Sequence, residues 1–163
     1  MGSVFITGGS RGIGAACVRA FAEAGRPAAF TYSARRDKAE ALAAETGALA
    51  LCADSADRDA VENAVKTARE SLGAIDTVVC NAGIAQQKLF QDITDDEWLT
   101  MLNVNLMGAV RTIRAALPDM LHRQKGSIVI VSSMWGERGA SCESHYAASK
   151  AALIGLSKSL ALE

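Results

Sequence analysis

Short apolar segments alternate with longer amphipathic segments along the whole chain of 163 residues. Short apolar runs bounded by turn residues are typical of strands that are covered on both faces. The pattern predicts five strands, over Ser3–Thr7, Ala28–Tyr32, Ala48–Cys52, Thr77–Cys80 and Ser127–Ser132. It predicts helices over Gly14–Ala24, Lys38–Thr46, Arg58–Ser71, Asp95–His122 and from Tyr146 to the end.

This alternation of strands and helices is typical of βαβ units and predicts an α/β fold with a parallel sheet. Gly25 and Gly47 stand where glycines commonly end helices, and Thr94 to Glu97 forms a capping box before the fourth helix. Right-handed crossovers then give a doubly wound sheet with strand order 3-2-1-4-5 and helices on both faces. Since the sequence contains no repeat or linker, we expect a single domain over residues 1–163, with its ligand crevice between the first and fourth strands.

Composition narrows the class of protein. Half of the residues are hydrophobic and the net charge is -1, so no basic surface for nucleic acid is expected. The four cysteines (Cys17, Cys52, Cys80, Cys142) lack metal-ligand spacing, and three of them lie in apolar stretches typical of reduced core thiols. We therefore expect no metal site. No basic leader begins the chain and no apolar stretch reaches the roughly 20 residues of a membrane helix, so a cytoplasmic protein without membrane contact is expected.

The first chemical signal is Tyr146-Ala147-Ala148-Ser149-Lys150. A tyrosine and a lysine four positions apart lie on the same face of a helix. An ammonium beside a phenol stabilises the phenolate, and this lowers the tyrosine pKa from its ordinary value of about 10 toward the range of an acid/base catalyst. Taken alone, such a pair is more typical of an exposed helix surface.

The second signal is Thr7-Gly8-Gly9-Ser10-Arg11-Gly12-Ile13-Gly14, which follows the first strand and opens a helix. Gly8 allows a tight turn, Gly12 allows the backbone to approach a pyrophosphate, and Gly14 allows close packing of helix on sheet. The helix N-terminus adds partial positive charge. Ordinary turn chemistry is the alternative interpretation of these glycines.

Together with Asn81-Ala82-Gly83, Asn105, Ser132-Ser133 and Tyr146-x-x-x-Lys150, this glycine spacing resembles the classical short-chain dehydrogenase/reductase family. The resemblance covers essentially the whole chain and implies a Rossmann fold. In overall look the sequence is most similar to the 3-oxoacyl-(acyl-carrier-protein) reductases. The resemblance therefore implies an oxidoreductase that reduces a small-molecule or carrier-bound carbonyl with a nicotinamide cofactor.

The same resemblance implies a role for each matching residue. Tyr146 would donate the proton to the carbonyl oxygen, and Lys150 would lower the tyrosine pKa and hold the nicotinamide ribose. Ser133, rather than Ser132, would hydrogen-bond the reacting oxygen, because two residues separate it from Gly136. Asn105 would interrupt the helix and bind a water that links the lysine to solvent. His145 and His122 are expected to be non-catalytic, the latter as a capping or surface residue.

The cofactor is expected to be NADP(H) rather than NAD(H), because Tyr32 occupies the place of the acid that binds the ribose of NAD. Arg11, Arg35 and Arg36 supply cations nearby, although Arg35 and Arg36 also suit the start of a solvated helix. Asp54 matches the residue beside the adenine ring. The expected cofactor-binding residues are Gly8, Ser10, Arg11, Gly12, Ile13, Gly14, Tyr32, Arg35, Asp54, Asn81, Ala82, Gly83, Tyr146 and Lys150.

Two departures from the family pattern and three alternative functions remain. Cys80 replaces the first asparagine of the family's Asn-Asn-Ala-Gly, and family members continue beyond Glu163 with two more strands and the segment that covers the substrate. The chain is thus expected to be incomplete at its C-terminus. Residues 135–143 are also similar to a bacterial subgroup that reduces a ketone on modified elongation factor P. A catalytically idle dinucleotide-binding protein is the second alternative, and sugar-nucleotide epimerases rank third.

Assembly is the last expectation. In the family, two subunits commonly pair the long fourth helix and the Tyr-Lys helix, and Leu153, Leu156 and Leu160 recur at helical spacing along the latter. We expect a homo-dimer or homo-tetramer of the longer chain. Packing on the chain's own sheet is the other role open to these leucines. An apolar fifth strand at the sheet edge is expected to favour aggregation of this segment alone.

Overall fold

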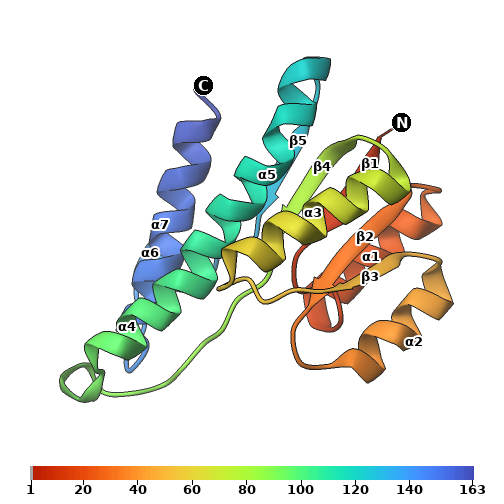
Figure 1. Ribbon diagram of the computed structural model, residues 1–163. Helices are drawn as coiled ribbons and strands as arrows, with labels where there is room; N and C mark the ends of the chain where they lie inside the picture. The colour runs from red at the N-terminus through yellow and green to blue at the C-terminus, as the bar shows by residue number, and fades with distance from the viewer. Residues whose placement is uncertain (1) are drawn as a thin grey trace.

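Five parallel strands form one sheet in the computed structural model, which describes residues 2–163 (Figure 1). In sequence order they are β1 (Ser3–Ile6), β2 (Ala28–Tyr32), β3 (Leu49–Cys52), β4 (Ile75–Cys80) and β5 (Ser127–Ile130). In space their order is β3-β2-β1-β4-β5, with parallel pairing at every ladder. The predicted α/β fold and strand order are confirmed.

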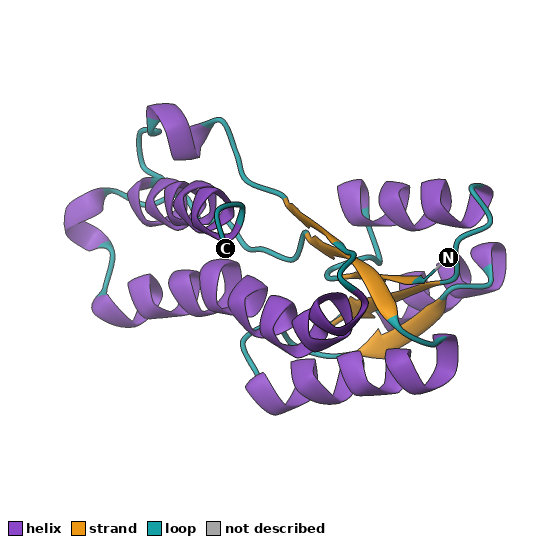
Figure 2. Ribbon diagram, turned by 90° about the horizontal axis from the view of Figure 1, so that it is seen from above, coloured by secondary structure: helices purple, strands orange, loops and turns teal. Residues whose placement is uncertain are grey.

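Helices cover both faces of this sheet (Figure 2). The crossovers contain α1 (Gly12–Glu23), α2 (Arg36–Thr46), α3 (Arg58–Leu72), α4 (Asp95–Leu102) and α5 (Gly108–Arg123), and the last helix is α7 (Ser144–Leu160). Two short helices were not predicted from the sequence, η1 (Phe90–Asp92) and α6 (Trp135–Arg138). Each is only about one turn long, so neither produces a hydrophobic period that the sequence could reveal.

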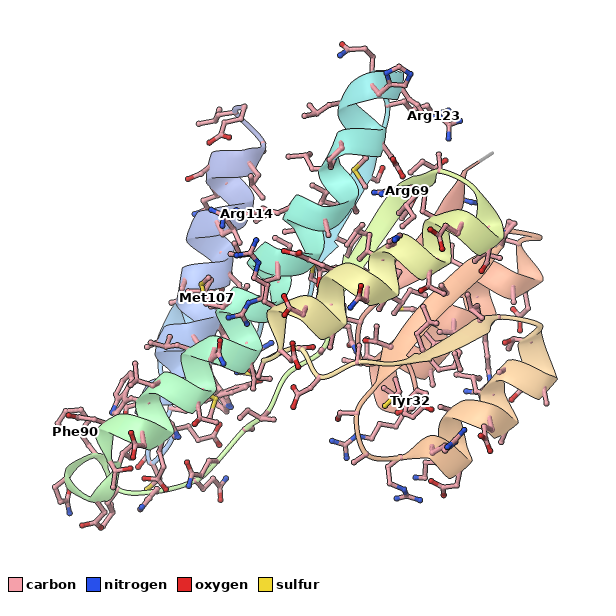
Figure 3. All side chains as sticks on the ribbon, viewed as in Figure 1. Tyr32, Arg69, Phe90, Met107, Arg114 and Arg123 are labelled. Atoms are coloured by element: carbon pink, nitrogen blue, oxygen red, sulfur yellow. The ribbon has the colours of Figure 1, made fainter. Side chains whose placement is uncertain are left out.

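Successive residues of β1 point to opposite faces of the sheet and enter two separate apolar cores. Phe5 joins the core beneath α3, α5 and α7, whereas Val4 and Ile6 join the core beneath α1 and α2. Arg69 links α3 to α5, since its Nε donates to Asp119 Oδ2 at 2.8 Å (Figure 3). The central strand is therefore fixed from both sides, and its C-terminal end becomes a rigid base for the loop that follows.

The sequence predicts strands that are covered on both faces of the sheet. This prediction is confirmed for the central strands and is wrong for the two edge strands, β3 and β5. β1 is fully buried, but β3 and β5 are partly exposed, and Val129 of β5 retains 47% of its surface. An edge strand has a neighbouring strand on one side only, so fewer surrounding residues cover its faces. Leu153 is buried in the core under α7, with Leu156 and Leu160 packed against the same core. These three leucines thus serve the chain's own fold.

The predicted helix over Asp95–His122 is not regular throughout. It begins with the expected Thr94 capping box and then widens into η2 (Asn103–Met107), a π-helical turn, before α5 continues the same path. In η2 the Gly108 N–H donates to Asn103 O, five residues back. A π turn of this kind is frequent at functional sites.

Burial corrects one expectation about the cysteines. Only Cys80 is buried, whereas Cys17 and Cys142 are partly exposed and Cys52 is exposed, so the expectation of three core thiols is wrong. Desolvation raises the pKa of the Cys80 thiol to about 12.

Within residues 2–163, no helix has the length and apolarity to cross a membrane, and no three His, Cys, Asp or Glu side chains cluster as metal ligands.

Candidate active site

The glycine turn after β1 has a geometry that only glycine fits at two positions. Gly8 has φ +66°, a left-handed conformation that side chains disfavour. A Cβ on Gly14 would lie 2.3 Å from Gly8 O, so α1 could not pack this closely on the turn with any other residue. No acidic residue or side-chain cap occupies the first turn of α1. Its N–H groups thus offer a positive helix end to an anion.

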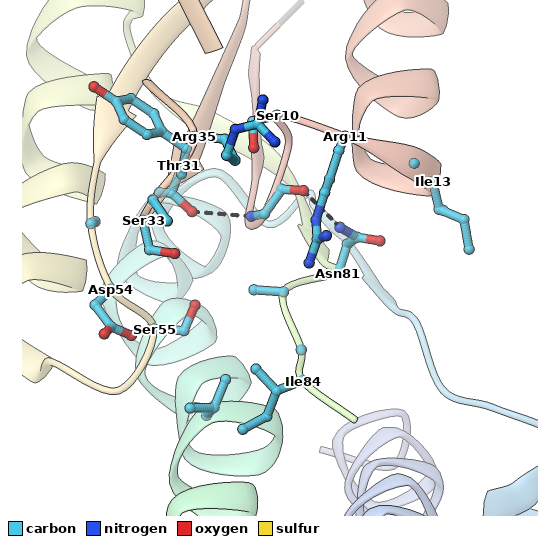
Figure 4. Close-up of a pocket in the computed structure, with 18 of the residues that line it drawn as sticks. Ser10, Arg11, Ile13, Thr31, Ser33, Arg35, Asp54, Ser55, Asn81 and Ile84 are labelled. Carbon is cyan, nitrogen blue, oxygen red and sulfur yellow. Dashed lines mark hydrogen bonds between the residues drawn. The ribbon is translucent and has the colours of Figure 1, made fainter. Parts of the chain in front are cut away.

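Polar side chains from neighbouring strands hold this turn in place. Asn81 Nδ2 donates to Thr7 O and Gly8 O, both at 3.1 Å, and Thr7 Oγ1 accepts from Asn81 N and Ala82 N, both at 3.0 Å. From the other side, Gly8 N donates to Thr31 Oγ1 at 3.2 Å (Figure 4). The ends of β1, β2 and β4 are therefore joined at the switch point of the sheet.

A cavity of about 940 Å³ opens above these strand ends. Eleven of the predicted cofactor residues line it: Gly8, Ser10, Arg11, Gly12, Ile13, Tyr32, Arg35, Asp54, Asn81, Ala82 and Gly83 (Figure 4). Gly14 instead lies beneath the turn. Eight lining residues were missed from the sequence, namely Thr31, Ser33, Ala34, Ala53, Ser55, Ile84, Thr100 and Val104. Several of them are sequence neighbours of predicted residues at the ends of strands. A position next to such a residue was therefore the signal that could have identified them.

The cationic side of this cavity is partly neutralised. Arg35 donates to Asp37 through Nε at 3.0 Å and through a terminal nitrogen at 2.7 Å. The hydrogen bonds from Arg35 lower the pKa of the Asp37 carboxyl to about 2. Arg36 donates to Glu40 Oε1 on α2 through Nε alone, at 2.7 Å. Within residues 2–163, Arg11 has no ion-pair partner, so it is the cation at this cavity that can meet an anion without losing another contact.

The tyrosine and lysine of the motif lie together on α7. Lys150 Nζ is 5.8 Å from the centroid of the Tyr146 ring and donates to Val131 O at 2.9 Å. The Lys150 side chain is buried, and this desolvation lowers the pKa of its ammonium. A Cβ on Gly83 would lie 3.5 Å from Lys150 Nζ, so the ammonium borders the segment that lines the cavity. Tyr146 and Lys150 do not themselves line that cavity.

The two serines after β5 have different contacts. Ser132 Oγ donates to Lys150 O at 2.8 Å, so its proton is used to hold α7. Ser133 Oγ instead accepts from Trp135 N at 3.2 Å, and its own proton stays available for another acceptor. Close packing of Gly136 on the Lys150 backbone keeps α6 and α7 together, since a Cβ there would lie 2.8 Å from Lys150 C.

Asn105 lies at the centre of the π turn and is almost fully buried, at 1% exposure. Its Oδ1 accepts from Ile84 N at 2.8 Å, and its Nδ2 donates to Ile84 O at 3.0 Å and Ser149 Oγ at 3.0 Å. Ser149 Oγ donates in turn to Tyr146 O at 2.7 Å. Asn105 thus joins the loop after β4 to the helix that carries Tyr146 and Lys150.

Three further residues that the sequence analysis discussed have defined surroundings. His145 is fully buried, with Nε2 at 2.9 Å from Gln86 Oε1. His122 is exposed in the last turn of α5. Cys80, which stands in place of an asparagine, is close to Ala109 O, with its Sγ at 3.9 Å. That thiol therefore lies against α5 rather than between strands.

Comparisons with known proteins agree with this geometry. The short chain dehydrogenase family matches residues 3–163. The chain is 39% identical over 160 residues to an acetoacetyl-CoA reductase of Synechocystis, covering 98% of this chain and 64% of that protein. It is 37% identical over 166 residues to a 3-oxoacyl-(acyl-carrier-protein) reductase of Staphylococcus aureus, covering 99% of this chain and 68% of that protein.

Solved structures extend the likeness to three dimensions. A short chain dehydrogenase from Burkholderia cenocepacia, determined in complex with NADP, superposes with a TM-score of 0.90 at 38% identity. That match covers 98% of this chain and 67% of the other. A short-chain dehydrogenase/reductase mutant from Serratia marcescens gives a TM-score of 0.87 at 36% identity, covering 95% and 65% of the two chains. This chain thus spans about two thirds of the length of its relatives, and it belongs to the short-chain dehydrogenase family.

Proposed function

We propose that this chain is the cofactor-binding and catalytic part of an NADP(H)-dependent carbonyl reductase, similar in its reaction to the 3-oxoacyl-(acyl-carrier-protein) and acetoacetyl-CoA reductases. The observation that carries the proposal is the position of the Tyr146–Lys150 pair. Lys150 Nζ borders Gly83, and Gly83 lines the cavity that begins at the glycine turn. An acid/base pair therefore adjoins a site built for a dinucleotide.

The residues around the cavity fit NADP(H). The Gly8 turn and the uncapped N-terminus of α1 suit a pyrophosphate, because they offer backbone N–H groups and the first turn of α1 carries no acidic residue. Arg11 and Arg35 suit the phosphate on the adenosine ribose, and Tyr32 stands where an acid would repel it. Asp54 and Ser55 border the place expected for the adenine. When bound, NADPH supplies the hydride.

The chain's own residues then supply the proton and the orientation. Tyr146 donates its phenolic proton to the carbonyl oxygen, and Ser133 donates a hydrogen bond to the same oxygen because its proton is not used within the fold. The Lys150 ammonium stabilises the tyrosinate that remains. Asn105 keeps Ile84 and Ser149 in place and belongs to the π turn, a feature that is frequent at functional sites.

Replacement of the proton donor tests this proposal. In the full-length enzyme, Tyr146→Phe keeps the ring and removes only the hydroxyl, so reduction of acetoacetyl-CoA should fall by at least about 100-fold. The affinity for NADPH and the melting temperature should stay within error. Lys150→Ala should reduce both turnover and NADPH binding. Near-normal turnover of the Tyr146→Phe variant would show that the proton comes from another group.

Substrate and assembly are part of the same proposal. Acetoacetyl-CoA, a 3-oxoacyl carrier protein and a ketone on modified elongation factor P represent free, carrier-bound and protein-bound carbonyls, and rates with the three would rank the substrates. Homo-oligomerisation is proposed from the family resemblance, because two subunits of such enzymes commonly pair their long helices; here α4 and α5 leave Leu99 and Leu121 64% and 60% exposed. Light scattering of the full-length protein should give a dimer or a tetramer. A dinucleotide-binding protein without activity would bind NADPH yet reduce none of these carbonyls.

A further inference from the structure

Three consecutive residues after β4 lie against the segment that precedes Tyr146. Gln86 Oε1 is 2.9 Å from His145 Nε2, Gln87 Nε2 donates to Glu143 Oε1 at 3.1 Å, and Lys88 N donates to Cys142 O at 2.7 Å. The two segments run in opposite directions, because residues 86, 87 and 88 contact residues 145, 143 and 142, in that order. Hydrogen bonds therefore hold the start of α7 against the loop that borders the cofactor cavity.

Gln86 also reaches the helix on its other side. Its Nε2 donates to Glu97 Oε1 of α4 at 2.8 Å, and Lys88 Nζ contacts both oxygens of the same carboxylate at 2.9 and 2.8 Å. Glu97 accepts from Thr94 N as well. The hydrogen bonds from Lys88, Thr94 and Gln86 lower the pKa of Glu97 to about 2, so this group is a carboxylate at neutral pH and can only accept.

This arrangement determines where each proton lies. Because the Glu97 carboxylate accepts, the NH₂ of Gln86 faces it and the Gln86 carbonyl oxygen faces His145. A carbonyl oxygen cannot donate, so His145 Nε2 carries the proton. In a neutral ring Nδ1 is then unprotonated, and this atom is buried without a hydrogen-bond partner among residues 2–163. The ring also packs edge-on against Trp98 of α4, with 5.8 Å between centroids.

We propose that Gln86 is a positioning residue for Tyr146, acting through the buried His145. The effect on catalysis rests on the proposed function. The position of the proton on His145 rests only on the hydrogen bonds described above. Asn105 anchors the loop at Ile84, and His145 anchors it two residues later at Gln86. The loop, α4 and the first turn of α7 are thereby held in one geometry. A shift of about 1 Å at a reacting group lowers turnover by about 100-fold, so this geometry decides how well Tyr146 reaches a carbonyl.

The neighbouring glutamines provide a matched pair of variants in the full-length protein. Gln86→Met keeps the length of the side chain but removes both contacts, whereas Gln87→Met removes only a contact at the surface. We expect Gln86→Met to lower kcat for acetoacetyl-CoA by at least about tenfold, with the Kd for NADPH within twofold of wild type. Gln87→Met should change kcat less than twofold. Equal kcat values for the two variants would overturn the proposal.

Nitrogen-15 NMR of the imidazole tests the proton arrangement without any turnover. Residues 1–163 contain two histidines, so a His122→Gln background removes one imidazole signal, and the signal that disappears in His145→Gln is assigned to His145. The expected spectrum at neutral pH has a protonated Nε2 and an unprotonated Nδ1, and the Gln86→Met variant should lose this single tautomer. A spectrum with the proton on Nδ1 would refute the arrangement. If the wild-type enzyme reduces no carbonyl while the spectrum is as expected, the proposed function fails and the arrangement stands.

A second variant covers the case in which Gln86→Met does not fold. His145→Gln keeps a donor toward Gln86 Oε1, whereas His145→Leu removes it at similar bulk. We expect His145→Gln to retain at least half of the wild-type kcat and His145→Leu to lose at least tenfold. Loss of activity in both variants alike would show that His145 acts by filling space, which contradicts a hydrogen-bonded positioning role.

Discussion

Substitution of Gly14 by alanine is expected to disrupt the cofactor site through a single methyl group. The added Cβ would lie 2.3 Å from Gly8 O and 2.6 Å from Asn81 Nδ2. Ordinary carbon contacts lie at about 3.5 to 4.0 Å, so the turn or α1 must move by about 1 Å. Overpacking of this kind costs about 1–3 kcal/mol of stability. Because Gly8 and Asn81 both line the cavity, the shift also misaligns the N–H groups that face a pyrophosphate.

Gly155 offers the matched control. It is an exposed residue inside α7, and a Cβ there meets nothing within 4 Å. Gly155→Ala should therefore stabilise the protein by about 1 kcal/mol, which raises the melting temperature by about 2–4 °C. Gly14→Ala should instead lower the melting temperature and weaken NADPH binding by at least about tenfold, or 1.4 kcal/mol.

Fluorescence titration with NADPH and thermal unfolding measure both effects. The decisive comparison is NADPH affinity, because a variant that is merely less stable still binds when folded. If folded Gly14→Ala binds NADPH as tightly as wild type, the glycine turn is not the pyrophosphate site. If Gly155→Ala is destabilised, the steric surroundings described for α7 are wrong.

Three other predictions follow from charges and burial. Asp37→Asn should strengthen NADPH binding severalfold at most and leave NADH binding unchanged, because it frees Arg35 from its exposed ion pair with Asp37; an equal gain for NADH in parallel titrations would contradict this. The pKa of Glu97 is lowered from 4.5 to about 2, so its stabilising effect is present above pH 4.5 and lost as the pH falls through 2. Urea midpoints at pH 7 and pH 3 should therefore differ less for Glu97→Gln than for wild type, and an unchanged difference would argue against the Lys88–Glu97 contact. In thiol labelling at pH 8, Cys52 should react at once, whereas Cys80, buried with a pKa of about 12, should react only on unfolding; early labelling of Cys80 would show that its core opens.

The sequence was most informative where function requires a particular residue type. Gly8, Gly14 and Thr94 could be interpreted from turn, packing and capping chemistry, and all three have the expected local geometry. The strand order followed from the handedness of crossovers, which is independent of side-chain detail. These features are local or topological, so one sequence suffices to predict them.

Pairings between distant segments could not be predicted in this way. Nothing in the sequence indicates that Gln86 meets His145, because the contact depends on how two loops leave their elements. Arg35 was expected to serve a phosphate, but its present partner is Asp37, two residues along. The short helix α6 was missed because its four residues are too few for a period. Contacts between side chains that are distant in the sequence depend on the tertiary structure, and composition does not predict them.

The strand order has a consequence for how the protein is made. β1 pairs with β2, which follows closely, and also with β4, where Ser3 is paired with Ile75. During synthesis the first half of the sheet can assemble while the apolar edge of β1 still lacks its second neighbour. Long-range parallel pairing is slow, and open strand edges attract other chains. Of the five strands in this sheet, β1 therefore waits longest along the chain for its second neighbour, and the time between β1 and β4 is when a nascent chain most needs protection from its neighbours.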